Sequence, residues 1–227
     1  MSRQKKYSLI LDCETSSNAQ IVYNIGYVVV DNYGNIAEHR EFYTQEVYAN
    51  PITRTFVLET AFYNRNAKPR ANNLKKFWEV CVDILELKER YNIKEIYAYN
   101  CAFDKRVMKE TFELFYPNHK YPLTESFEWK CIWSMACQTI CKTASYRKFC
   151  EEYCFVSDSG NYITNAEVVF KYLTNDITFK EEHLALADVY IEAEIFWSCL
   201  KTHKKMDRNI IGSPWRMAQP KYFNQGA

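Results

Sequence analysis

The stretch that decides the fold is residues 7–15, YSLILDCET, an apolar run that ends in two acids. Its aliphatic residues predict a buried strand. Because side chains alternate between the faces of a strand, Asp12 and Glu14 point the same way, with Cα atoms roughly 6.5–7 Å apart. Two such carboxylates repel each other, and a bound divalent cation such as Mg²⁺ or Mn²⁺ removes the conflict. The alternative is a pair of solvated acids at the end of a strand.

Working outward, the sequence predicts a mixed α/β sheet flanked by helices, with three N-terminal strands and an antiparallel first hairpin. The turn signal Asp31–Asn35 joins strands expected over Ile21–Val30 and Ile36–Tyr43. A fourth strand is expected over Glu95–Tyr99. Helical spacing predicts helices over the following segments: Asn73–Tyr91, Asp104–Phe115, most of Cys131–Phe155, Asn165–Thr174 and Leu184–Lys201. Short helices are expected within Pro51–Arg70.

Composition limits the class of protein. The chain has 227 residues, of which 48% are hydrophobic, so we expect one folded domain over 1–207 and an extended or frayed tail over 208–227. A net charge of +1 argues against a protein that coats nucleic acid through a basic field. Nine cysteines and no long apolar run predict a soluble protein with reduced thiols, located in a cytoplasm (the host's, if the protein is viral) and not in a membrane.

Two further acids are expected at the same place as the first pair. Asp104 follows the strand over 95–99 at the start of a helix, where sites form at strand ends, although a helix N-cap or a first-turn acid is an equally good explanation. Asp188 lies on the inward stripe of the last helix, where an acid must be paired, hydrogen-bonded or metal-bound. His183, five residues earlier, is about 140° around an ideal helix. We therefore expect His183 in the loop that enters the helix, free to point at the same site.

Four carboxylates and a histidine indicate two-metal phosphoryl chemistry. The ions would polarise a phosphate, and His183 would take the proton from the attacking water.

Three short motifs in this order resemble the DEDDh 3′–5′ exonucleases of the ribonuclease H-like fold. They are Asp12-Cys13-Glu14-Thr15 (D-x-E-T), Asn100-Cys101-Ala102-Phe103-Asp104 (N-x-x-F-D) and His183-Leu184-Ala185-Leu186-Ala187-Asp188 (H-x-A-x-x-D). That family includes the proofreading subunit of the bacterial replicative polymerase, ribonuclease T and oligoribonuclease. Each motif alone is a weak signal, but all three in order, each on the predicted element, are a strong one.

The resemblance implies specific roles. Residues matching Asp12, Glu14, Asp104 and Asp188 hold two Mg²⁺ or Mn²⁺ ions in the family, and the histidine matching His183 is the general base. The sister subclass has Tyr where this chain has Leu184. Many relatives carry an Asp where this chain reads Cys131–Met135, which affects the substrate grouping more than the activity.

The expected substrate is single-stranded nucleic acid with a free 3′ end. DNA is favoured, and an exoribonuclease or oligoribonuclease is the alternative. Five residues near the motifs are candidates for substrate contact: Thr15, Asn100, Phe103, Lys105 and Arg106. A second hypothesis is a regulatory module on the exonuclease fold that docks to a polymerase or another protein. The two pairs Cys137/Cys141 and Cys150/Cys154 are interpreted as buried thiols, with zinc as the alternative.

Overall fold

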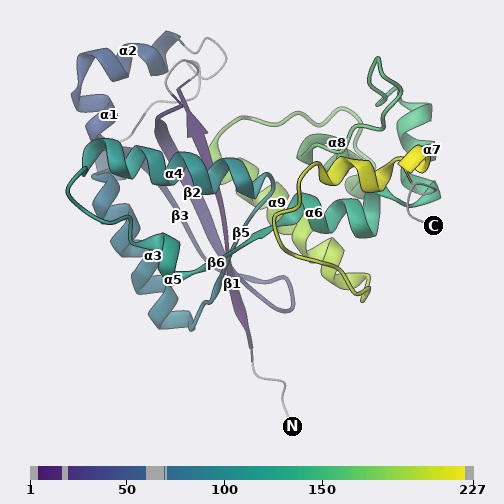
Figure 1. Cartoon of the computed structure of the whole chain (residues 1–227), viewed down its shortest axis with the longest axis horizontal. Helices are drawn as coiled ribbons and strands as arrows, with labels where there is room; N and C mark the ends of the chain where they lie inside the picture. Colours follow the sequence, from purple (N-terminus) through teal and green to yellow (C-terminus); the bar gives the residue numbers. More distant parts are fainter. Residues whose placement is uncertain (1–4, 17–19, 60–68, 70, 223–227) are drawn as a thin grey trace.

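A six-stranded mixed sheet in the order β4-β3-β2-β1-β5-β6 forms the centre of the molecule (Figure 1). The computed structural model describes residues 5–16, 20–59, 69 and 71–222. The strands are β1 (Tyr7–Thr15), β2 (Val22–Asp31), β3 (Ile36–Thr44), β4 (Leu74–Lys75), β5 (Glu95–Ala98) and β6 (Glu128–Cys131). Strands β1, β2 and β3 pair antiparallel, whereas β5 runs parallel to β1. The predicted α/β class and the predicted first hairpin are confirmed.

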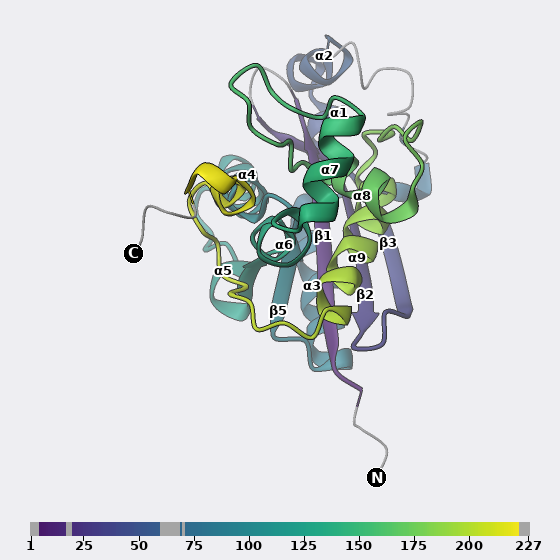
Figure 2. The same ribbon diagram turned by 90° about the vertical axis from the view of Figure 1, so that its right-hand side faces the viewer.

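Helices cover both faces of this sheet. Helices α3 (Phe77–Tyr91) and α4 (Cys101–Phe115) lie on one side, and the helices from α6 to α9 lie on the other (Figures 1 and 2). The second group comprises α6 (Ile132–Ala136), the π-helical turn η3 (Cys137–Cys141), α7 (Ala144–Glu152), α8 (Ala166–Thr174) and α9 (Ala185–Lys201). The remaining helical segments before α6 are α1 (Gln45–Ala49), α2 (Pro51–Glu59), η2 (Ala71–Asn73) and α5 (Leu123–Ser126).

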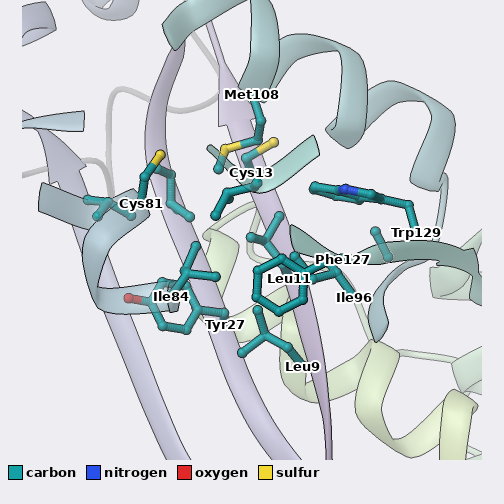
Figure 3. Packing of buried hydrophobic residues seen from close by; sticks show 14 of the residues in the cluster. Leu9, Leu11, Cys13, Tyr27, Cys81, Ile84, Ile96, Met108, Phe127 and Trp129 are labelled. Carbon is teal, nitrogen blue, oxygen red and sulfur yellow. The ribbon is translucent and has the colours of Figure 1, made fainter. Parts of the chain in front are cut away.

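The alternation of β1 separates the two clusters of buried hydrophobic residues on either face of the sheet. Leu9, Leu11 and Cys13 belong to the cluster under α3 and α4 (Figure 3). Ile10 belongs to the second cluster, with Val189 and Ile195 of α9. Since side chains alternate along a strand, the even-numbered residues of β1 face α9. Asp12 and Glu14 therefore lie on the α9 side, where acids follow the apolar Ile10 along the strand.

Three segments differ from the sequence-based expectation. In the helix predicted over 73–91, Asn73 instead ends η2, the next two residues form β4, and α3 begins at Phe77. Strand β6 was not predicted, because only Trp129 and Cys131 of its four residues are buried and Glu128 is exposed. It is an edge strand beside β5, and its alternation of exposed and buried residues spans only four positions, too few to identify a strand from the sequence. In the segment 51–70, α2 is a short helix as expected; residues 60–68 and 70 lie outside the described part.

The C-terminal segment is packed against the domain up to residue 222. It contains η4 (Pro214–Ala218) and η5 (Pro220–Tyr222), and Ala218 is fully buried. The side chain of Gln219 accepts the N–H of Tyr162 at 2.8 Å and donates to its carbonyl at 3.1 Å. The expectation of an extended or frayed tail is wrong for these residues, because paired backbone groups and an apolar contact hold them. Residues 223–227 lie outside the described part.

The cysteines behave mostly as predicted. Cys137, Cys141 and Cys150 are buried free thiols in the second cluster, but Cys154 is exposed. Among the described residues these cysteines form no group with metal-ligand spacing. Within the same residues, every helix is too short or too polar to cross a membrane.

Candidate active site

The carboxyl end of β1 brings Asp12 and Glu14 to the α9 face of the sheet. Asp12 is half-buried opposite Gly26, and Glu14 is 9% exposed opposite Asn24. Burial raises the pKa of Glu14 to about 7, although a hydrogen bond from Asp188 partly opposes this by lowering the pKa. Burial and the charge of Glu192 raise the pKa of Asp12 well above its ordinary value. The two acids thus lie among other acids, in a site that penalises their charged forms.

Asp104 reaches the same group from the other side of the sheet. It lies in the first turn of α4, is 3% exposed and accepts a hydrogen bond from the thiol of Cys13 at 3.2 Å. Burial raises the pKa of Asp104 to about 7, although the hydrogen bond from Cys13 lowers it. Its charge in turn raises the pKa values of Asp12 and Glu14. The N-cap position of α4 belongs to Asn100, which makes no side-chain capping hydrogen bond, and Asp104 is the acid of the first turn, as the alternative explanation also allowed.

Two residues of β2 fix the start of α9 against the sheet. Asn24 is fully buried, and its side-chain oxygen accepts the N–H of Ala185 at 2.9 Å, at the first position of α9. A Cβ atom at Gly26 would lie 2.3 Å from the backbone nitrogen of Leu186. Only glycine therefore permits this approach of helix to strand. Asn24 and Gly26 together bring the N-terminal turn of α9 to the acids of β1.

Asp188 and His183 complete the group from α9 and the loop before it. Glu14, His183 and Asp188 each offer one ligand atom, and these atoms lie within 4.8 Å of one another. Burial and the charges of Glu181 and Glu14 raise the pKa of Asp188 to about 8, and Asp188 shares a hydrogen bond with Glu14. His183 is half-buried in the loop that ends at Leu184, in a left-handed conformation with φ 53°. Burial lowers the pKa of His183, opposed by the charge of Glu167.

This donor set fits divalent cations. Carboxylate oxygens of Glu14 and Asp188 and an imidazole nitrogen of His183 converge on one point. Asp12 and Asp104 are not part of this group of ligand atoms, but their charges act on the acids around it. One oxygen of Asp188, Oδ1, is buried without a hydrogen-bond partner among the described residues. Burial raises the pKa values of all four acids, and repulsion by neighbouring carboxylates raises those of Asp12, Glu14 and Asp188 further. A hard cation supplies the missing opposite charge.

Several residues of the site escape the sequence motifs. Glu192 is 4% exposed in α9, and its charge acts on Asp12. Its position four residues after Asp188 puts it on the same helix face, a signal that was available in the sequence. Behind His183, Glu167 of α8 pairs with the buried Lys171 at 2.5 Å and accepts the N–H of Glu181 at 3.2 Å. These contacts hold the loop that carries His183.

The five predicted substrate residues lie in different environments. Thr15 is half-buried at the end of β1, and Asn100 is exposed before α4. Phe103 packs partly buried against the core, and Lys105 is half-buried. The exposed Arg106 donates to Gln20, just before β2, at 2.9 Å and pairs with Glu110 of its own helix at 2.7 Å. All five belong to the end of β1 or to the start of α4, beside the acids.

The solved structures that this chain resembles include exonucleases. Escherichia coli exonuclease I in complex with a 5cy-dT13 oligonucleotide matches with a TM-score of 0.53 and 19% identity, over 88% of this chain and 43% of that one. Exonuclease I in complex with the inhibitor BCBP matches with a TM-score of 0.56 and 18% identity, over 89% and 45%. A full-length 3′-exonuclease matches with a TM-score of 0.56 and 14% identity, over 92% and 88%.

The likeness is one of three-dimensional structure. No protein-family model matches the chain, and no curated protein sequence matches it. The chain spans less than half the length of the exonuclease I structures that it matches. The full-length 3′-exonuclease, in contrast, is covered over most of its length. The chain therefore shares the fold of these exonuclease structures, in agreement with the fold that the resemblance of its three motifs implied.

Proposed function

We propose that this protein is a metal-dependent 3′–5′ exonuclease that hydrolyses single-stranded nucleic acid to nucleoside 5′-monophosphates. The observation that carries the proposal is the convergence of Glu14, His183 and Asp188, with ligand atoms within 4.8 Å of one another. These residues lie beside Asp12 and Asp104 at the carboxyl end of β1, in an exonuclease fold. Glu14 belongs to the first motif, and His183 and Asp188 both belong to the third.

The four acids Asp12, Glu14, Asp104 and Asp188 would hold two Mg²⁺ or Mn²⁺ ions. When bound, such ions polarise a phosphoryl oxygen and lower the pKa of a water molecule. Asp12 and Glu14 are fixed by strand pairing with β2, and Asp104 by the hydrogen bond from Cys13. Metal-ligating carboxylates that are held by rigid elements keep their geometry through turnover.

His183 would act as the general base. Its lowered pKa keeps the imidazole neutral at pH 7, so it can accept a proton from the attacking water. The charge of Glu167 then favours the imidazolium that forms. Because His183 lies in a loop and not in α9, its ring can face the acids together with Asp188.

The substrate proposal rests on the chemistry at the same edge of the sheet. In the exonuclease I structure the bound ligand is an oligonucleotide, which supports a single strand as the substrate class here. Arg106 and Lys105 would contact phosphates, Phe103 would contact a base, and Thr15 and Asn100 would contact the terminal nucleotide. We favour DNA over RNA, with the exoribonuclease activity as the alternative outcome of the test.

A direct test uses matched DNA and RNA oligonucleotides labelled at their 5′ ends. With Mg²⁺ or Mn²⁺ the protein should shorten one or both strands stepwise, and EDTA should stop the reaction. Asp104→Asn keeps the side-chain shape and should lower the rate by at least 100-fold with the far-UV circular dichroism unchanged. The proposal is wrong if neither strand is shortened with either metal, and the ligand assignment is wrong if Asp104→Asn retains full activity.

A further inference from the structure

Glu192 is a buried acid outside the three motifs. It is 4% exposed in the middle of α9, one helical turn beyond Asp188 and on the same face of the helix. Charged residues are almost never buried to this extent unless they are paired. Glu194, two residues later, is in contrast exposed and lies 3.6 Å from Lys201.

The charges that act on Glu192 have its own sign. They are those of Asp104, Asp188 and Glu181. Glu192 is in turn the charge that acts most strongly on Asp12. The residue therefore lies within the electrostatic reach of three of the four motif acids, which come from β1, α4 and α9.

Hydrogen bonding leaves one side of this carboxylate open. The backbone N–H of Tyr99, just after β5, donates to Glu192. Its Oε2 atom is buried without a hydrogen-bond partner among the described residues, and so is Oδ1 of Asp188 one turn earlier. An unpartnered buried carboxylate oxygen is costly and rare in proteins. Two of them on one helix face, beside a cluster of acids, favour a binding place for a divalent cation.

We infer that Glu192 is a fifth carboxylate of the metal centre, and that its Oε2 helps to hold the divalent ions, directly or through a bound water. The inference rests on the proposed function for the presence of those ions. Four acids already balance the charge of two divalent ions, and metal affinity rises with the number of charged ligands. The fifth acid is therefore expected to keep the ions bound when no nucleic acid is present.

The test measures Mn²⁺ binding by isothermal titration calorimetry, on the full chain and without substrate. Glu192→Gln removes the charge but keeps an oxygen that can accept the N–H of Tyr99. Its Kd for Mn²⁺ should be at least 10-fold higher than that of the wild type. Glu194→Gln, the same change at an exposed position of the same helix, should leave the Kd unchanged. A wild-type Kd in Glu192→Gln would overturn the inference.

Thermal unfolding separates a metal role from a structural one. Without metal, Glu192→Gln should unfold at the wild-type temperature or above it, because a repelled buried charge is gone. The rise in Tm caused by Mn²⁺ should shrink. A lower metal-free Tm with a full Mn²⁺ effect would show that Glu192 only supports Tyr99. If Glu192→Gln does not fold, Glu192→Asp serves instead: it keeps the charge but withdraws the carboxylate, and an unchanged Kd for Mn²⁺ would overturn the inference.

Failure of this inference can be told from failure of the proposed function. Wild-type protein that binds Mn²⁺ and degrades oligonucleotides, with equal binding in Glu192→Gln, refutes the inference alone. Weaker Mn²⁺ binding in Glu192→Gln, with no nuclease activity in the wild type, refutes the proposed function and leaves the inference standing. Wild-type protein that binds no Mn²⁺ refutes both.

Discussion

At the scale of single residues, His183 is held in an uncommon backbone conformation. Its φ of 53° is in the left-handed region, where a residue other than glycine costs of order 1–3 kcal/mol. Such strain persists only where the surroundings enforce it, and here the helix cap at Asn24 and the contacts of Glu167 do so. The consequence is that the imidazole meets Glu14 and Asp188.

Replacing His183 by asparagine tests the proposed base. Asparagine tolerates the left-handed conformation, so His183→Asn should fold normally. Its kcat should fall by about 10²–10⁴-fold, the usual contribution of a general base. His203→Asn is the matched control, since His203 is exposed and also has a positive φ of 52°. Equal rates for the wild type and His183→Asn in single-turnover digestion would contradict the assignment.

Arg106 is the residue best placed to test substrate contact. Arg106→Ala should raise KM for an oligonucleotide about tenfold, the usual loss of one charge-assisted contact, with little change in kcat. Lys109 also pairs with an acid of α4 four residues on, so Lys109→Ala removes a comparable surface charge as the control. A KM that rises equally in both variants would mean that only the general surface charge matters.

At the scale of elements, the contact between β2 and the start of α9 positions the site. Gly26→Ala introduces a Cβ 2.3 Å from the Leu186 nitrogen, and backbone atoms cannot yield as a flexible side chain can. Overpacking of this kind costs about 1–3 kcal/mol. A displaced α9 also moves Asp188 and His183, and about 1 Å of misplacement can lower a rate 100-fold.

We therefore expect Gly26→Ala to lower both Tm and kcat, measured by calorimetry and by oligonucleotide digestion. Gly212→Ala is the control, because a Cβ there meets no atom within 4 Å. Full activity in Gly26→Ala would show that the helix tolerates a shift, and that its close approach to β2 is not required for the chemistry.

The sequence predicted the elements that carry their own pattern. Strand β1, the first hairpin and helices α3, α4, α8 and α9 follow from alternation or helical spacing, and the three motifs placed the candidate acids on them. Contacts between distant segments could not be predicted in this way. Asn24 and Ala185 are 161 residues apart, and no local pattern around either residue indicates their hydrogen bond. Glu192 was overlooked because the motif ends at Asp188, although the helix face continues.

At the scale of the whole molecule, the buried acids couple stability to pH and metal. The folded-state pKa values of Glu14, Asp104 and Asp188 are raised to about 7, 7 and 8. In the unfolded chain such groups ionise near pH 4. Between about pH 4 and pH 8 the folded protein therefore holds more protons than the unfolded chain, and metal-free stability must fall as the pH rises.

Metal-free protein should accordingly have a lower Tm at pH 8 than at pH 5.5, and Mn²⁺ should reverse this trend because it binds the ionised acids. For a chain of this length, 1 kcal/mol corresponds to about 2–4 °C in Tm. Differential scanning calorimetry at pH 5.5 and pH 8, with EDTA and with Mn²⁺, measures the change in Tm in each case. A metal-free Tm that stays constant or rises from pH 5.5 to pH 8 would be inconsistent with a buried cluster of repelling acids.

The most direct test of the central claim is the polarity and metal dependence of cleavage. A single strand is labelled with ³²P at the last internucleotide phosphate, and a second copy at the 5′ end. With Mg²⁺ or Mn²⁺, the first turnover should release the 3′ label as a nucleoside 5′-monophosphate while the 5′ label stays on a long strand, and EDTA should prevent this release. Release of the 5′ label first, or no release from DNA or RNA with either metal, would contradict the account.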